Sequence, residues 1–149
     1  MNPLTAYSSL FISAFVAATL LPAQSEAVLA ALLLADRYSI ALLVTFATAG
    51  NVAGSLINWW LGRGVDALAH RRWFPLKPAR LEAFQAWYRK YGRWSLLLSW
   101  APLIGDPLTI AAGASREPLS SFVLLVTIAK LGRYIVVAWL VVQTISAHQ

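Results

Sequence analysis

The sequence predicts an all-α integral membrane protein that is an inverted repeat of two units, each a re-entrant helical hairpin followed by a transmembrane helix. The composition, the lengths of the apolar stretches and a repeated motif predict this fold. Of the 149 residues, 59% are hydrophobic and 12% are charged. Soluble domains have about 25% charged residues, so the composition favours lipid as the surroundings. We treat residues 1–149 as one membrane domain.

The first repeat, about residues 6–61, contains two apolar stretches. Stretch 38–61 is long enough to cross a bilayer, which takes about 20 helical residues. Stretch 6–35 has a proline near its middle, and proline interrupts a helix. Its two halves are then too short to cross, so we expect a re-entrant hairpin. The tip of this hairpin comprises Pro22, Gln24 and Ser25.

Residues 62–93 form a basic loop that is predicted to end in an amphipathic helix at the membrane surface. They contain eight basic and two acidic residues, which accounts for the whole net charge of +6. The positive-inside rule places such a loop in the cytoplasm. Within the loop, Leu81, Phe84, Tyr88 and Tyr91 are spaced to share one helical face. A short linker helix in water is the alternative.

The second repeat, about residues 94–145, follows the same order. Stretch 94–115 is interrupted by prolines near its middle and is predicted to be a second re-entrant hairpin. Stretch 119–145 is long enough to be the second span. The tip of this hairpin comprises Pro102, Gly105 and Pro107.

A shared motif indicates that the two halves are copies. Each half has a proline and, four residues later, an acid, which is Glu26 in the first half and Asp106 in the second. Each then has Leu-Val-Thr-x-Ala-x-x-Gly followed by a polar residue, at 43–51 and 125–133. One hairpin plus one span crosses the membrane once, so the second copy is expected to be inverted. Inverted repeats with broken helices near the midplane are a transporter design.

Four ionisable residues lie inside apolar stretches, where a charge at a helix centre costs roughly 2.5–3.5 kcal/mol. One interpretation is a polar chamber in which the bases bind an anionic headgroup and an acid carries a proton or acts as a gate. The other is two ion pairs that lock the hairpins to the spans. The candidate substrate- and proton-binding residues are Glu26, Asp106, Lys130, Arg133, Asn51 and Asn58.

Glycines recur on the first span at a spacing that permits close helix packing, which is the role we assign to Gly50, Gly54 and Gly62. Neither His70 nor His148 has a nucleophile or metal-ligand partner at useful spacing. We therefore expect no catalytic residue, no metal and no cofactor, and we do not expect an enzyme.

These motifs resemble those of the DedA family, also called the VTT-domain family, and most closely its short YqaA-like bacterial branch. The resemblance covers nearly the whole chain. The residues that carry it are Leu21-Pro22 and Ser25 in the first hairpin, Gly54, Trp59 and Gly62-Arg63 in the first span, and Tyr91-Gly92, Ser99-Trp100-Ala101-Pro102 and Ala112-Gly113 around the second hairpin.

The resemblance implies two facing re-entrant hairpins and the movement of lipids across a membrane, such as polyprenyl phosphates or phospholipids. This chain departs from the family pattern at its charged positions. The hypothesis that Lys130 and Arg133 supply the missing positive charge follows from this departure. The family acids fall on Gln24 and Ser55, and the two hairpin arginines fall on Ser99 and Gly105.

The first functional hypothesis is therefore a lipid flippase or scramblase of the bacterial inner membrane. Its expected partners are membrane lipid and a second copy in a homodimer, and nucleic acid is not expected. The alternatives are a proton-coupled carrier of a small solute and a membrane scaffold that transports nothing.

Overall fold

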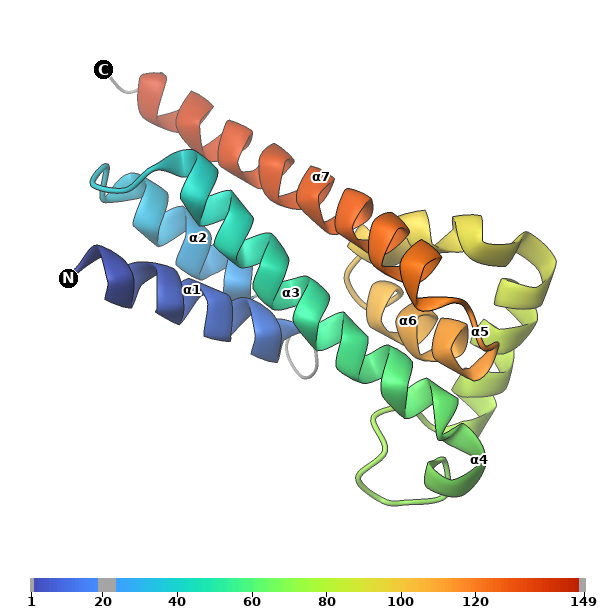
Figure 1. Ribbon diagram of the computed structural model, residues 1–149. Coiled ribbons are helices and arrows are strands. Elements are labelled where there is room, and N and C mark those ends of the chain that lie inside the picture. Colours follow the sequence, from blue (N-terminus) through green and yellow to red (C-terminus); the bar gives the residue numbers. More distant parts are fainter. Residues whose placement is uncertain (1, 19–23, 148–149) are drawn as a thin grey trace. The chain divides into compact units, whose positions relative to one another are not determined.

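The computed structural model describes residues 2–18 and 24–147, and every regular element in these ranges is helical (Figure 1). The all-helical prediction is thereby confirmed. The helices are α1 (Pro3–Ala17), α2 (Gln24–Leu34), α3 (Ile40–Arg63), α4 (Val65–Leu68), α5 (Pro78–Tyr91), the 3₁₀ helix η1 (Gly92–Trp100), α6 (Gly105–Ala114) and α7 (Leu119–Ser146).

Two helices, α3 and α7, are long and apolar enough to span a bilayer. They have 24 and 28 residues, and at 1.5 Å per residue they extend about 36 and about 42 Å. In contrast, α1 and α2 have 15 and 11 residues, or about 22 and about 17 Å. Neither reaches across the hydrocarbon core of about 30 Å. α1 ends at Ala17 and α2 begins at Gln24, and Pro22, predicted at the hairpin tip, lies outside the described residues.

The helices form two compact units. The first unit comprises Met1–Gly54 and Lys130–Gln149, and the second comprises Ser55–Ala129. The first unit contains the short helices α1 and α2, the second contains α4, α5, η1 and α6, and each also contains one part of α3 and one part of α7. The sequence repeats divide the chain differently, because they assign each long helix to a single half.

The apolar core of the first unit draws on four helices. α1 begins at Pro3, where its missing N–H costs nothing, and the Asn2 side chain accepts a hydrogen bond from the Leu4 N–H at 3.1 Å. Small and branched apolar side chains then fill the space between the helices. The buried residues of this core are Ala6, Leu10, Leu29, Leu32, Leu33, Leu43, Val44, Ala47, Tyr134 and Ala138.

The second unit includes the short helices η1 and α6. The turn between them contains Pro102 and Leu103, whose φ of 69° is left-handed. Gly105 and Pro107, predicted at the hairpin tip, instead lie in the first turn of α6. Proline is tolerated there because the first N–H groups of a helix have no partner within it.

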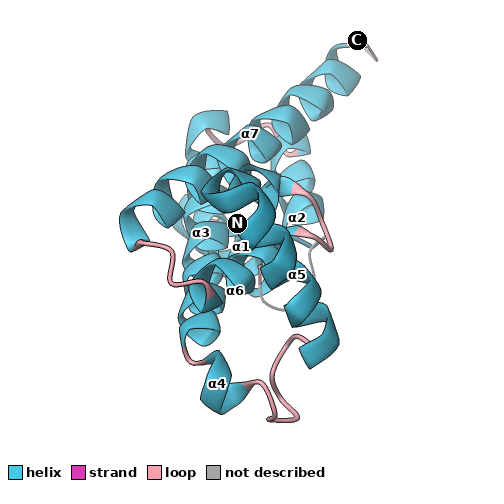
Figure 2. Ribbon diagram, turned by 90° about the vertical axis from the view of Figure 1, so that its right-hand side faces the viewer, coloured by secondary structure: helices cyan, strands magenta, loops and turns pink. Residues whose placement is uncertain are grey.

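The predicted amphipathic helix is α5, and most of its apolar face packs against protein. Leu81 and Tyr88 are buried and Phe84 is half-buried, whereas Tyr91 is exposed. Leu81 shares its apolar cluster with Ile110 of α6. The periodicity thus predicted the helix and its face but not the surface that this face contacts. Figure 2 shows α5 and the other helices from a second direction.

Glycines bring backbones into contact within each unit. A Cβ atom on Gly50 would lie 2.3 Å from the Phe11 carbonyl oxygen of α1, and one on Gly54 would lie 2.6 Å from the Phe15 carbonyl oxygen. Because real Cβ contacts are not this short, both positions accept only glycine without movement of α1. α3 and α1 are therefore packed backbone to backbone.

The second unit has two close glycine contacts of the same kind, both between α3 and α6. A Cβ atom on Gly62 would lie 2.0 Å from the Ile110 carbonyl oxygen, and one on Gly113 would lie 1.9 Å from the Trp59 carbonyl oxygen. Each helix thus contributes one glycine to the contact. Gly132, which the sequence repeat aligns with Gly50, has no atom within 4 Å of the corresponding Cβ position.

We expect Gly50→Ala to lower the thermal unfolding midpoint in detergent, because the added methyl group must displace the backbone of α1. Overpacking of this kind costs typically 1–3 kcal/mol. Gly132→Ala is the matched control in the same unit, and the better helix propensity of alanine should leave it neutral or slightly stabilising. Equal midpoints for the two variants would contradict the packing role of Gly50.

Candidate functional site

An ion pair joins α2 to α7 inside the first unit. Arg133 Nε lies 2.5 Å from Glu26 Oε1 and donates a hydrogen bond to it. The Arg133 side chain is 9% exposed and the Glu26 side chain 32%. The acid is in the first turn of α2, and the base is in the middle of the long apolar helix α7. The structure thus pairs one acid and one base of the four that the sequence placed in apolar stretches.

Next to this pair, the hydroxyl of Tyr134 joins three helices. It lies 2.9 Å from Ser25 Oγ of α2, and it accepts a hydrogen bond from Asn51 Nδ2 of α3 at 2.9 Å. Tyr134, Ser25 and Asn51 are all buried. Two consecutive residues of α7, Arg133 and Tyr134, therefore hold two consecutive residues of α2. We call Ser25, Glu26, Asn51, Arg133 and Tyr134 the first-unit polar cluster.

The first unit also contains polar atoms that have no hydrogen-bond partner among the described residues. These are Asn51 Oδ1 in the cluster and Thr48 Oγ1, one helical turn before it on α3. Lys130, three residues before Arg133 on α7, is 2% exposed. A buried acceptor without a partner costs about 1–3 kcal/mol. Asn51 Oδ1 and Thr48 Oγ1 thus have hydrogen-bonding capacity that the described residues do not use.

The structure places the remaining predicted residues as follows. Asn58 is buried in α3, and Asp106 is half-buried in the first turn of α6; both belong to the second unit. Gln24 begins α2 and is exposed. Of the predicted binding residues, the structure brings Glu26, Asn51 and Arg133 together.

Two of the positions at which the resemblance predicted family charges hold small buried side chains. Ser55 and Ser99 are both buried, and neither hydroxyl has a hydrogen-bond partner among the described residues. Gly105, a third such position, begins α6, where a Cβ atom would lie 2.3 Å from the Ser99 carbonyl oxygen. The close contact between η1 and α6 therefore leaves no room for a larger side chain at Gly105.

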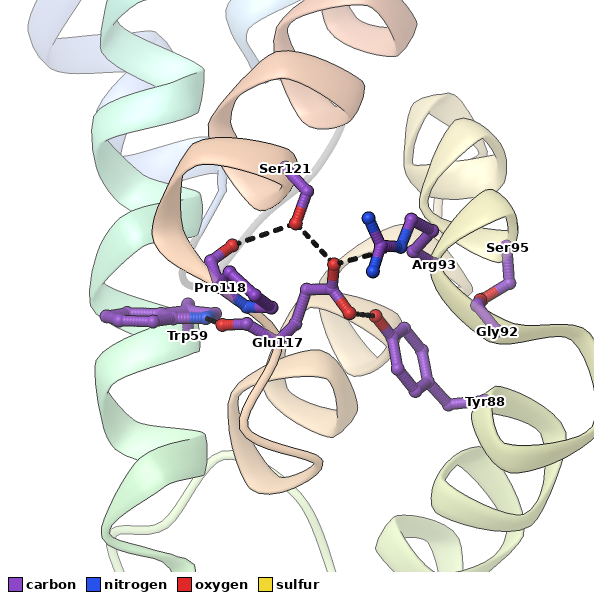
Figure 3. A network of polar contacts seen from close by, with 8 residues as sticks. All are labelled: Trp59, Tyr88, Gly92, Arg93, Ser95, Glu117, Pro118 and Ser121. Carbon is purple, nitrogen blue, oxygen red and sulfur yellow. Dashed lines mark hydrogen bonds and ion pairs between the residues drawn. The ribbon is translucent and has the colours of Figure 1, made fainter.

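Sequence reasoning missed a second polar cluster, which centres on Glu117 in the second unit (Figure 3). Its carboxylate accepts hydrogen bonds from Tyr88 Oη at 2.5 Å and from Ser121 Oγ, and Arg93 Nε lies 3.6 Å away. Its backbone oxygen accepts a hydrogen bond from Trp59 Nε1 at 3.0 Å. The Glu117 side chain is 8% exposed. These contacts join α3, α5 and the start of α7.

The pKa of the Tyr88 hydroxyl is raised well above its ordinary value, first because the group is buried and then because it donates to the Glu117 carboxylate. Tyr88 therefore stays protonated and remains a hydrogen-bond donor. The missed residues had weak signals. Glu117 lies just outside the apolar stretches, and Tyr134 is an aromatic residue in an apolar helix.

A family model for the VTT domain matches residues 11–143. The chain belongs to the VTT-domain (DedA) family. The inner membrane protein YqaA of Escherichia coli (strain K12) is 40% identical to it over 135 residues, which cover 91% of this chain and 90% of YqaA. YqaA of Shigella flexneri matches to the same extent. No solved structure matches the chain.

A third relative, an uncharacterized protein of Haemophilus influenzae, is 34% identical over 88% of this chain and 84% of its own length. The similarity to YqaA and the two candidate spans agree on location, and this VTT-domain protein is an inner membrane protein. The predicted family and membrane are thereby confirmed. The described residues contain no group of three side chains suited to hold a metal ion.

We expect Tyr134→Phe to destabilise the first unit, because both Ser25 Oγ and Asn51 Nδ2 lose their hydrogen-bond partner. Each buried polar group left without a partner costs about 1–3 kcal/mol. Unfolding by a denaturing detergent in mixed micelles would measure the change. Tyr7→Phe is the matched control, since its hydroxyl accepts only an exposed 3.3 Å hydrogen bond from the Ser39 N–H among the bonds described here. A Tyr134→Phe protein as stable as this control would refute the linking role of the hydroxyl.

We expect Tyr88→Phe to loosen α5, because it removes a hydrogen bond to a charged group, worth about 1.5–3 kcal/mol. Trypsin cleavage at Arg89 and Lys90 reports local opening of α5 and should become faster by on the order of tenfold. Tyr91→Phe, one turn later and exposed, should be cleaved at the wild-type rate. Unchanged cleavage in Tyr88→Phe would mean that Glu117 does not hold α5.

Proposed function

We propose that this VTT-domain protein is a lipid transporter of the flippase or scramblase type for lipids with an anionic phosphate headgroup. The observation that carries the proposal is the Glu26–Arg133 ion pair, which connects a helix too short to span the bilayer with a long apolar helix. Ionisable groups in such segments are costly and mark substrate or ion pathways.

Arginine suits this role because its planar guanidinium donates two parallel hydrogen bonds to a phosphate. In the ion pair, Glu26 occupies the place that a phosphate would take on Arg133. A headgroup that reaches the cluster therefore competes with Glu26 for the same donor. We assign Glu26 the role of a gate, because it must leave Arg133 before a headgroup can take its place there.

The surroundings of the pair also favour an anion. The cluster lies at the beginning of α2, and the N-terminal end of a helix carries a partial positive charge. Lys130 is buried on the same long helix, three residues before Arg133. Ser25 and Asn51 add hydrogen-bonding groups that can contact an uncharged part of a headgroup.

Asp106 and Asn58 of the second unit are also proposed to take part in transport, and no enzymatic reaction is assigned. A homodimer is proposed because a single copy of the chain, with two spans and four short segments, has little lipid-facing wall with which to enclose a lipid. Under the alternative of a proton-coupled solute carrier, a soluble phosphate compound would compete with the lipid. Under the scaffold alternative, the ion pair would serve only to hold α2 against α7.

Transport is tested with purified protein in liposomes that contain a fluorescent phospholipid, whose movement is followed by chemical bleaching from outside. The double variant Glu26→Gln with Arg133→Met removes both charges of the ion pair together, so neither of them is left buried without the other. We expect its transport rate to fall at least tenfold, because a charge-assisted contact is worth about 1.5–3 kcal/mol. Arg37→Gln, an exposed arginine of the same unit, is the matched control.

Folding of each variant is checked by gel filtration and thermal unfolding, so that loss of transport is separate from loss of structure. A folded double variant that transports at the wild-type rate would contradict the proposal. Wild-type protein that moves no lipid, with a double variant less stable than the control, would support the scaffold alternative. Inhibition of the wild type by soluble glycerol phosphate would support the solute carrier.

A further inference from the structure

Aromatic side chains gather on the outside of the second unit where α5 continues into η1. Trp87, Tyr91 and Trp94 are all exposed, and the rings of Trp87 and Tyr91 lie 4.6 Å apart between centroids. α5 packs against the protein through Leu81 and Tyr88, so these exposed rings are not needed for that packing. Exposed apolar surface of this kind marks a contact with a partner or with lipid.

Two adjoining hollows run along this aromatic surface. One has a volume of about 380 Å³ and the other about 280 Å³, and both are lined by Trp87 and Leu98. Because they share these two lining residues, the hollows lie side by side, and we call the two together the α5–η1 groove. Its other lining residues are Tyr91, Trp94, Ser95, Ala83, Phe84 and Ile104.

The edge of the groove is basic. Lys90 Nζ lies 5.2 Å from the centre of the Tyr91 ring, and Tyr91 lines the groove. Arg89 precedes Lys90, and Arg93 is 53% exposed although it reaches towards Glu117. The whole segment 62–93 carries the net charge of the chain. An aromatic groove beside these cations repels a cationic headgroup and attracts an anionic one.

We propose that the α5–η1 groove binds one acyl chain of an anionic phospholipid, with the lipid phosphate held by Lys90. The apolar groove matches the chain, and the basic edge matches the phosphate. Tryptophan and tyrosine favour the level of the headgroups in a bilayer, and basic residues near the surface attract anionic lipids. The occupant is a lipid of the membrane in which this inner membrane protein resides.

This lipid is a resident one, distinct from the transported lipid. None of the residues of the first-unit polar cluster lines the groove, and the groove lies entirely within the second unit. A bound chain would cover the exposed rings of Trp87 and Trp94 and hold α5 against η1. Binding of this lipid in the groove therefore does not depend on whether the protein transports lipid.

The test is lipid binding to the purified full-length protein in a neutral detergent, measured by native mass spectrometry. Phosphatidylglycerol and phosphatidylcholine with identical acyl chains are titrated separately. We expect phosphatidylglycerol to bind more tightly by on the order of tenfold. Lys90→Glu should remove this preference, whereas Lys77→Glu, an exposed lysine at the start of α5, should keep it.

A second variant tests the groove apart from the charge. Ala83→Trp places an indole in the groove from an exposed position of α5 and should weaken binding of both lipids at least tenfold. Trp94→Ala, which removes an exposed wall, should also weaken both. Gel filtration shows whether each variant is folded.

Three outcomes would overturn the proposal. The first is equal binding of the two lipids to the wild type. The second is an equal effect of Lys90→Glu and Lys77→Glu. The third is displacement of the lipid by soluble glycerol phosphate as effectively as by phosphatidylglycerol, which would make Lys90 a phosphate site without an acyl chain in the groove.

Discussion

Polar side chains buried in a membrane protein need hydrogen-bond partners, because neither the protein interior nor the bilayer core offers free water. The polar side chains at the beginning of α2 have such partners in the first unit. Ser25 and Glu26 contact Tyr134 and Arg133 of α7, so a single turn of the long apolar helix provides partners for the polar side chains of the short one. The same four residues hold the unit together and form the site to which we assign function. Stability and chemistry therefore depend on one set of contacts.

Close helix packing accompanies these polar contacts in each unit. Gly50 brings the backbone of α1 against α3, and the next residue, Asn51, reaches Tyr134. In the second unit, Gly62 and Gly113 draw α3 and α6 together, and Trp59, whose carbonyl oxygen Gly113 approaches, donates its indole N–H to the Glu117 backbone. Each unit thus combines a close glycine contact between two helices with a polar cluster that joins several helices.

The sequence predicted the helices well and their surroundings poorly. The bounds of α5 follow from Pro78 and the 3.6-residue spacing, but burial of Tyr88 depends on Glu117, 29 residues away. Glu26 and Arg133 were recognised as costly charges, yet their pairing across 107 residues was one of several arrangements. Tyr134 gave only a weak signal, because a hydroxyl on an aromatic ring suits an interface as well as an interior. Pro107 was predicted at the hairpin tip but lies in the first turn of α6, where a proline does not break the helix.

By itself, the sequence determined the membrane location, the helical fold, the two long helices and the breaks between the short ones, because hydropathy and proline act locally along the chain. Only the tertiary structure decided which acid meets which base, which face of α5 is covered, and that Tyr134 and Glu117 are the centres of the two clusters. These contacts join residues far apart in the chain. Their identity depends on the packing of helix against helix, which residue spacing within one helix does not encode.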